Sequence, residues 1–356
     1  MKILNKYLLK EITLNVLLVM VALIAMFSFF DLIQELDALG KGNYGLGKVL
    51  LYVLLSAPGH VYDVMPVAVL VGTMYSLGQF ARYSELIVFR VSGFSVASIA
   101  VLLLKIGLIF TLMTFLIGEL ITPLSEKMAQ KMRVQATDSV VAQEFRSGLW
   151  VKDGNNFINA VEVLPDTSLL NVNIYEFDKN AKLLKTRTAK SGVYLKGEWL
   201  LKGVTETTFN IESVKVTKLP EMNWQSLIRP ELLSVLLVMP EKMSAINLYS
   251  YINHLSVNKQ KTTRYEVALW AKFIYPVACM VMVILALPFA FGHQRAGNAS
   301  SKIFIGIMLG VAYQILNRIF SHLGQLNDWP PLLSAMTPTV LFFTAALAML
   351  YFVERR

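Results

Sequence analysis

The sequence predicts an α-helical membrane protein with six transmembrane helices, arranged as three plus three around an inserted all-β domain of jelly-roll type. Of its 356 residues, 55% are hydrophobic and 16% are charged, whereas about a quarter of the residues in a soluble domain are charged. Six apolar runs are each long enough to cross about 30 Å of hydrocarbon. A polar stretch with short alternating segments separates the third run from the fourth.

The apolar runs before the polar stretch cover residues 12–33, 49–80 and 96–121. The second run is longer than one crossing requires, and Pro58 and Pro66 interrupt it. We therefore expect a bent helix, or an interfacial elbow that leads into a span. The runs after the polar stretch cover residues 267–291, 303–320 and 331–353. We expect Gly107, Gly306 and Gly310 to let neighbouring helices approach closely.

The polar stretch, residues 123–265, reads as a separate domain with helical connectors. Residues 125–145 predict a helical extension, and residues 244–255 predict a helix that leads back toward the membrane. Between them lie seven strand-like segments, at residues 148–152, 156–163, 171–177, 182–189, 198–202, 207–211 and 214–219. Short strands separated by turn signals favour a sandwich or a jelly roll. The predicted domains are therefore residues 1–122, 123–265 and 266–356.

Basic residues in the short loops predict the orientation of the spans. One side of the membrane carries most of them, namely Lys2, Lys6, Lys10, Arg82, Arg90, Arg295, Lys302, Arg355 and Arg356. The opposite side carries Lys41 and Lys48 in its first loop. Both termini are therefore predicted to be cytoplasmic. The insert then lies outside, and its own lysines do not oppose this because long domains cross regardless of charge.

A charged island at residues 81–95 separates the second and third apolar runs. Ser84 is a candidate N-cap, and Glu85 then lies in the first turn, where the helix dipole favours a carboxylate. Gly93 is a candidate stop, and Arg82 is predicted to share a helix face with Glu85. The island is either an ordinary intracellular loop or the place where a cytoplasmic partner holds the protein.

Five ionisable residues are predicted to lie near membrane depth. Lys272 and Arg318 sit at the outer ends of two spans, and Lys41 lies at a similar depth. Each cation either snorkels to the interface or pairs with a phosphate of an amphiphile held between spans. His60 and Asp63 are functional candidates because ionisable groups are costly in the membrane, although an interfacial position explains them equally well.

Several classes of function lack their signature in this sequence. The basic residues are scattered and form no nucleic-acid-binding patch. Residues 42–48 match the start of a phosphate-binding loop, but Val49 replaces the Ser or Thr that would hold Mg²⁺. Cys279 is the single cysteine and is expected to be a packing residue. No nucleophile or ligand partner lies at useful spacing from the histidines, which are His60, His254, His293 and His322.

Four segments together carry a resemblance to a known family. They are RYSEL at residues 82–86, SGF at residues 92–94, GLWVKDGNNF at residues 148–157, and RY with LWAK between residues 264 and 272, followed by Pro276. In these motifs and in its layout, essentially the whole chain resembles the permease family of the lipopolysaccharide exporter, the LptF/LptG proteins. The tryptophan-bearing segments favour the LptG branch.

The resemblance implies a non-catalytic subunit of an ATP-binding-cassette transporter in the inner membrane of a Gram-negative cell. The partners it implies are the paralogous permease LptF, a dimer of the ATPase LptB, LptC and, through LptC or LptF, the LptA bridge. This chain would hold no cofactor, because ATP and Mg would bind to LptB. The implied task is to take lipopolysaccharide from the outer leaflet of that membrane and pass it to a periplasmic bridge.

The resemblance also assigns the island as the coupling helix, at about residues 82–93, with Glu85 facing the ATPase. The expected coupling residues are Arg82, Ser84, Glu85, Leu86, Phe89, Arg90 and Gly93. The expected lipid-binding residues are Lys272, Arg318 and Lys41, of which only Lys272 lies in a family-like segment. Some family members carry a basic pair just after the first span, where residues 34–37 of this chain are acidic instead, so that contact is not transferred.

Similar rolls stack into the bridge in this family, which makes the edges of the β domain relevant. Lysines crowd two adjacent predicted strands and their turns, namely Lys179, Lys182, Lys185, Lys190 and Lys196. Lysine on an edge strand opposes pairing. We therefore expect the paralogue's roll, and not this one, to carry the bridge.

Two other classes of function remain open at this stage, a membrane-anchored periplasmic sensor and an ion-coupled carrier. A sensor needs a cytoplasmic output domain, and no cytoplasmic segment is long enough for one. A carrier that works alone favours ionisable residues at the bilayer midplane and internal repeats. Co-purification with a soluble ATPase separates the transporter subunit from both.

Overall fold

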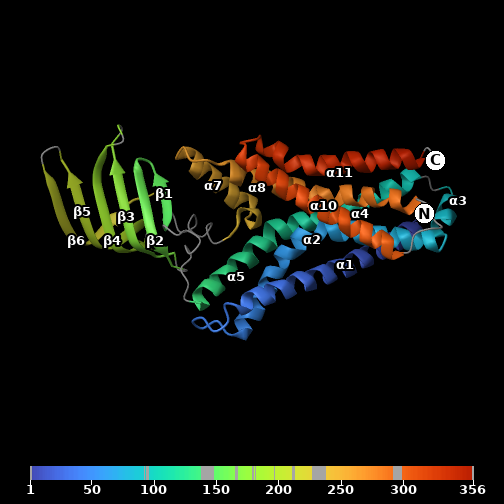
Figure 1. The fold of residues 1–356 in the computed structure, drawn as a ribbon, viewed down its shortest axis with the longest axis horizontal. Coiled ribbons are helices and arrows are strands. Elements are labelled where there is room, and N and C mark those ends of the chain that lie inside the picture. The colour runs from blue at the N-terminus through green and yellow to red at the C-terminus, as the bar shows by residue number, and fades with distance from the viewer. Residues whose placement is uncertain are drawn as a thin grey trace.

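The computed structural model describes residues 2–91, 93, 96–137, 148–164, 167–178, 180, 182–195, 197–210, 213–226, 238–291 and 299–354. The molecule is elongated, with a bundle of long helices at one end and a β-sheet at the other (Figure 1). Both chain termini and the short helix α3, Glu85–Val91, lie at the end of the bundle far from the sheet. Several residues used above lie outside the described part, namely Ser92, Phe94, Lys179, Lys196, His293, Arg295, Arg355 and Arg356.

Six helical segments in the described residues are long and apolar enough to cross a membrane. Three precede the sheet in the chain and three follow it. The helices before the sheet are α1 (Lys2–Leu36), α2 (Leu46–Arg82), α3, α4 (Val96–Leu116), the π-helix η1 (Ile117–Ile121) and α5 (Thr122–Ala136). The helices after it are α7 (Ala245–Val257), α8 (Thr263–Ala286), α9 (Pro288–Phe291), α10 (Ala299–Leu326) and α11 (Pro331–Glu354).

The second apolar run was expected to form a bent helix or an interfacial elbow, and in the structure it is one continuous helix, α2, which contains both Pro58 and Pro66. Proline has no backbone N–H to donate to the carbonyl four residues earlier, so each proline interrupts the hydrogen-bond ladder of α2 without ending the helix. The hydroxyl of Thr122 donates to the carbonyl of Pro58 at 3.2 Å. The helical extension predicted at residues 125–145 is confirmed as far as Ala136, since η1 and α5 continue α4 without a break, and residues 138–147 lie outside the described part.

Glycines permit the close helix contacts that the sequence predicts. A Cβ on Gly107 would lie 3.0 Å from the Cα of Met280 on α8, and one on Gly310 would lie 2.6 Å from Val67 on α2. Gly72 was not singled out in advance, yet a Cβ there would lie 2.6 Å from the backbone of Val16 on α1. Small residues therefore allow α1, α8 and α10 to pack tightly against their neighbours.

The described strands form one antiparallel sheet in the order β1-β2-β3-β4-β5-β6. Their bounds are β1 Leu149–Asp153, β2 Asn156–Val163, β3 Leu169–Phe177, β4 Leu183–Leu195, β5 Glu198–Phe209 and β6 Val214–Trp224. The described residues form six strands where seven were expected, because the segment 198–202 and residues 207–209 of the segment 207–211 belong to one strand, β5. Trp199, Leu201, Val172 and Ile174 are fully buried in the core of this domain.

The lysine argument about sheet edges placed the edge on the wrong strand. β4 carries Lys185 and Lys190, but it pairs with β3 on one side and β5 on the other, so it is an interior strand. Among the described strands the edges are β1 and β6. β6 itself carries Lys215, Lys218 and Pro220, which are residues typical of a protected edge.

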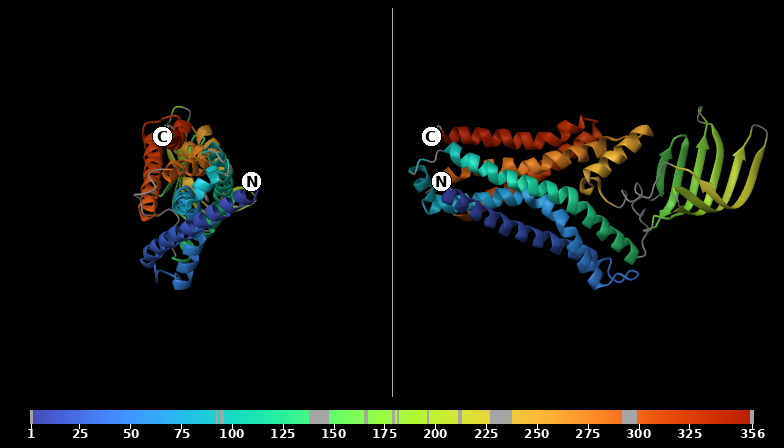
Figure 2. Two further views of the ribbon diagram at one scale, coloured as in Figure 1. Left: turned by 90° about the vertical axis from the view of Figure 1, so that its right-hand side faces the viewer. Right: turned by 180° about the vertical axis from the view of Figure 1, so that it is seen from behind.

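The connector between the sheet and α8 is described from residue 238 to residue 262, and its helix α7 is seen beside α8 in the views of Figure 1 and Figure 2. It contains the 3₁₀ helix η2, Pro240–Lys242, followed by α7. At the far end of α7, the side-chain carbonyl of Asn258 accepts a hydrogen bond from the backbone N–H of Gly154 at 3.0 Å. Gly154 lies in the β1–β2 turn, so this bond links the connector to the sheet.

Candidate functional site

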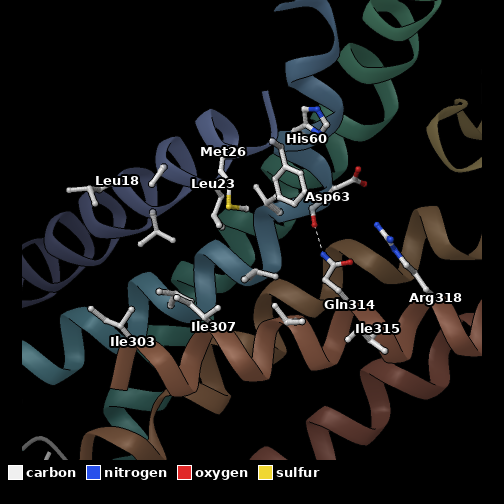
Figure 3. A pocket seen from close by; sticks show the side chains of 17 residues that line it. Leu18, Leu23, Met26, His60, Asp63, Ile303, Ile307, Gln314, Ile315 and Arg318 are labelled. Atoms are coloured by element: carbon white, nitrogen blue, oxygen red, sulfur yellow. Dashed lines mark hydrogen bonds between the residues drawn. The ribbon is translucent and has the colours of Figure 1, made fainter. Parts of the chain in front are cut away.

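An apolar cleft of about 710 Å³ lies between α1, α2 and α10. Figure 3 shows Leu18, Leu23 and Met26 of α1 facing Ile303 and Ile307 of α10 across it. The polar lining residues gather at one end of the cleft, where they are His60, Asp63, Gln314 and Arg318. The cleft therefore has a long apolar part and a polar mouth.

Hydrogen bonds fix the walls of this polar mouth. The side chain of Gln314 on α10 and the hydroxyl of Tyr275 on α8 both donate to the backbone carbonyl of Asp63, each at 2.5 Å. On the other wall, the imidazole of His60 pairs with the carboxylate of Asp31 on α1 at 2.5 Å. These contacts tie α1, α8 and α10 to the same turn of α2.

A second, more polar pocket of about 780 Å³ adjoins the cleft and shares Asp63, Gln314 and Arg318 with it. Its walls come from α2, η2, α8 and α10. Its cationic lining residues are Lys242, Arg264, Lys272 and Arg318, and its carboxylates are those of Asp63 and Glu241. Cations outnumber carboxylates in this lining, so the pocket suits an anionic group.

Lys272 lies inside the protein and not at its lipid-facing surface, with 2% of the residue exposed. Its ammonium group donates to the backbone carbonyl of Glu241 at 3.3 Å and lies 4.9 Å from the centre of the Tyr62 ring. A side chain held in this way faces the second pocket and does not snorkel along the bilayer. Arg318 lines both pockets, so the structure brings these two predicted lipid-binding residues together.

Lys41, the third predicted lipid-binding residue, lies apart from the other two. It is exposed in the turn after α1 and lines neither pocket. In the acidic region just before it, Glu35 is buried and accepts hydrogen bonds from the hydroxyl of Tyr44 and from Nε of Arg133, both at 2.9 Å. Burial and the Glu35 carboxylate raise the pKa of Tyr44 above its usual value.

The island contains a helix, as expected, and α3 presents two different faces. Leu86 and Phe89 are buried in the hydrophobic core of the helix bundle, where the Phe89 ring lies 6.2 Å from the ring of Phe80. The opposite face exposes the apolar side chains of Ile87, Val88 and Val91 to the surroundings, and Tyr83 in the preceding turn is also exposed. This face is free to receive a partner in the described structure, and it lies at the end of the bundle far from the sheet (Figure 1).

One detail predicted for the island is wrong. Arg82 is the last residue of α2 and Glu85 is the first of α3, so they do not share the face of one helix. Ser84 between them has φ +59°, and its backbone carbonyl accepts the N–H groups of Ile87 and Val88. The turn therefore starts a new helix.

Three further residues of the island were predicted to be functional, namely Gly93, Glu85 and Arg90. Gly93 has φ +89°, a conformation suited to glycine just beyond a helix end. The Glu85 side chain is half-buried beside the Tyr7 hydroxyl of α1. The side chain of Arg90 lies outside the described residues.

Sequence reasoning missed the residues that the connector adds to the second pocket. Met239, Glu241 and Lys242 precede α7 and line the pocket beside α8. Nothing in the local pattern of η2 marks it as a pocket wall. Arg264 lies in a family-like segment, which was the only available signal for this side of the pocket.

Six candidate spans enclosing an apolar cleft beside a cationic pocket define a class, the multi-pass membrane proteins that can hold an amphiphile. The family model described as lipopolysaccharide export system permease LptF/LptG matches residues 6–351. The chain is 30% identical over 351 residues to the LptG permease of Escherichia coli K12, covering 98% of each chain. It is 29% identical over 341 residues to LptG of Haemophilus influenzae, covering 95% of each. The chain belongs to the LptF/LptG permease family and is therefore a multi-pass inner-membrane protein.

Proposed function

We propose that this chain is the LptG-type permease subunit of a lipopolysaccharide exporter. It takes lipopolysaccharide from the outer leaflet of the inner membrane and passes it to a periplasmic bridge. The observation that carries the proposal is the apolar cleft joined to a cationic pocket, because a phosphorylated amphiphile needs both environments side by side. Family membership over residues 6–351 supports the same substrate.

In this proposal the cleft between α1, α2 and α10 receives acyl chains, and the second pocket receives the anionic headgroup. Lys272 and Arg318 are the proposed phosphate ligands, because charge-assisted hydrogen bonds to phosphate are among the strong ones. The burial of Lys272 supports this role, since its stem and ammonium group are already ordered. Lys41 is proposed as a weaker headgroup contact from the loop after α1.

The orientation follows from the distribution of charge in the short loops. Both termini and α3 are proposed to be cytoplasmic and the sheet periplasmic, which the position of α3 and the sheet at opposite ends supports (Figure 1). The proposed domains are residues 1–122, 123–265 and 266–356. The six-stranded sheet is proposed to form the wall of a jelly-roll-like domain that faces LptC and the LptA bridge.

The proposed membrane partner is the paralogous permease LptF, and the proposed energy source is a dimer of the ATPase LptB, which would hold ATP and Mg. The exposed apolar face of α3 is the proposed contact for the ATPase. The coupling residues are the island set defined above, and Glu85 is the proposed charged contact. No nucleotide-binding loop is needed in this chain.

Photocrosslinking in membranes tests the substrate assignment. A crosslinking residue at Ile307, inside the cleft, is expected to capture lipopolysaccharide. The matched control is Val340 on α11, which is 41% exposed and lines neither pocket. Equal capture at both positions, or none at Ile307, would refute a lipid site in the cleft.

Co-purification tests the coupling assignment. Glu85→Ala is expected to reduce recovery of the ATPase, because truncating one partner of a buried charge contact costs about 2–5 kcal/mol. Lys10→Ala, an exposed charge on α1, is the control and is expected to leave recovery unchanged. Normal ATPase recovery and normal lipid release with Glu85→Ala would show that Glu85 is not the coupling contact.

A further inference from the structure

The connector between the sheet and α8 is part of the wall of the cationic pocket. Three polar contacts hold it against the membrane helices. The ammonium of Lys242 pairs with the carboxylate of Glu126 on α5 at 3.2 Å, and the ammonium of Lys272 donates to the carbonyl of Glu241 at 3.3 Å. The N–H of Ala245 is 2.9 Å from each carboxylate oxygen of Glu119 on η1.

Lys242 differs from the other cations of the pocket in its position. It is carried by η2 and not by a membrane helix. Its side chain is 22% exposed, whereas that of its partner Glu126 is 7% exposed. An ammonium group has three donors, so Lys242 can keep its contact with Glu126 while it donates to a group in the pocket.

We infer that Lys242 is a further ligand for the anionic headgroup, contributed by the connector. The inference rests on the proposed function, which places a phosphorylated amphiphile in the two pockets. Lys242 lines the same pocket as Lys272 and Arg318, so one anionic headgroup can bind to all three side chains. Because η2 is the first described helix after the sheet in the chain, this contact would place the headgroup against the segment that joins the membrane helices to the exported domain.

Lipopolysaccharide binding to the detergent-purified complex, measured with native and with dephosphorylated lipid, tests this role. We expect Lys242→Gln to weaken binding of native lipid about tenfold, the usual scale for one hydrogen bond to a charged group. Lys242→Arg should retain most of the affinity. With dephosphorylated lipid, Lys242→Gln should have no further effect, because the group that it binds has been removed.

Two controls separate a ligand from a structural residue. Lys261→Gln changes an exposed lysine of the same connector, one that pairs with Asp328 at 2.8 Å and lies outside the pocket, and should bind lipid normally. The double variant Lys242→Gln with Glu126→Gln removes the buried charge that Lys242 leaves behind. If this double variant folds and binds native lipid as tightly as the wild type, the role of Lys242 is structural and the inference is wrong.

The outcomes also separate the inference from the proposed function. If the wild type binds no lipopolysaccharide, the proposed function fails. If the wild type binds it and Lys242→Gln binds it equally well, only the inference fails. Inorganic phosphate at millimolar concentration is expected not to displace the lipid, and efficient displacement would identify a free-phosphate site and overturn the assignment to a lipid headgroup.

Discussion

Removing the carboxylate of Glu119 should release the N-terminus of α7 from the membrane helices. Both oxygens of this carboxylate lie 2.9 Å from the N–H of Ala245, the first residue of α7. The first N–H groups of a helix have no partner within it, and a nearby negative charge is favoured by the helix dipole. The hydroxyl of Ser244 accepts the N–H of Asn247, whereas Glu119 is the acceptor for the N–H of Ala245.

The expected magnitude follows from these contacts. A hydrogen bond to a charged group contributes about 1.5–3 kcal/mol. Glu119→Ala should therefore lower the free energy of local opening of α7 by about 2 kcal/mol. That corresponds to about a 30-fold increase in the population of the locally open state. Glu119→Gln keeps an acceptor and loses the charge, so about 1 kcal/mol, or roughly fivefold, is expected.

Hydrogen–deuterium exchange of the purified protein measures this opening. The peptides that cover α7 should exchange faster in the order wild type, Glu119→Gln, Glu119→Ala. Peptides from α11 serve as the internal control, because α11 is remote from this contact in sequence and should keep its wild-type rates. Unchanged exchange in α7, or an equal rise in α7 and α11, would refute the assignment of Glu119 as a local anchor.

Two further predictions concern packing at the same junction. Gly118→Ala places a methyl group 2.4 Å from the ring of Tyr62 and should destabilise the protein by about 1–3 kcal/mol through overpacking. The control is Gly47→Ala, because no atom lies within 4 Å of its new Cβ. Equal melting temperatures for the two variants would contradict the argument. Asn258→Ala removes the acceptor of the Gly154 N–H. Hydrogen–deuterium exchange at the β1–β2 turn should become about tenfold faster, because the loss of one buried hydrogen-bond partner costs about 1–3 kcal/mol. An unchanged exchange rate at this turn would show that the sheet does not depend on α7.

Hydropathy located the spans well, because a membrane crossing sets both the length and the polarity of a segment. The ends of the helices were less predictable. A helical extension after the third run was predicted to begin at residue 125, but the structure has no break before it, because the π-helix η1 joins α4 directly to α5. The alternation of polar and apolar residues likewise located the strands but did not show which strands are neighbours in the sheet. The interior strand β4, which carries lysines, was therefore wrongly taken for an edge strand.

The candidate site was predictable only in part, for a physical reason. Lys272 and Arg318 were identified from their depth in the membrane, which a sequence records through position in a span. Lys242 was missed because its place in the pocket depends on how η2 folds against α8, a tertiary contact. The prediction that Arg82 and Glu85 share a helix face was wrong because Ser84, which lies between them, adopts φ +59° and a new helix starts there.

The connector links the membrane helices to the β-sheet through its helix α7. α7 has 13 residues, and at 1.5 Å per residue it is a rod of about 20 Å. One end is held by Glu119 beside the wall of the cationic pocket, and Asn258, just past the other end, holds the β1–β2 turn. A rod fixed at both ends transmits displacement instead of absorbing it. A headgroup that binds to Lys242 would therefore displace the sheet through α7. Weakening either attachment of α7 should uncouple the membrane helices from the sheet while leaving both folded.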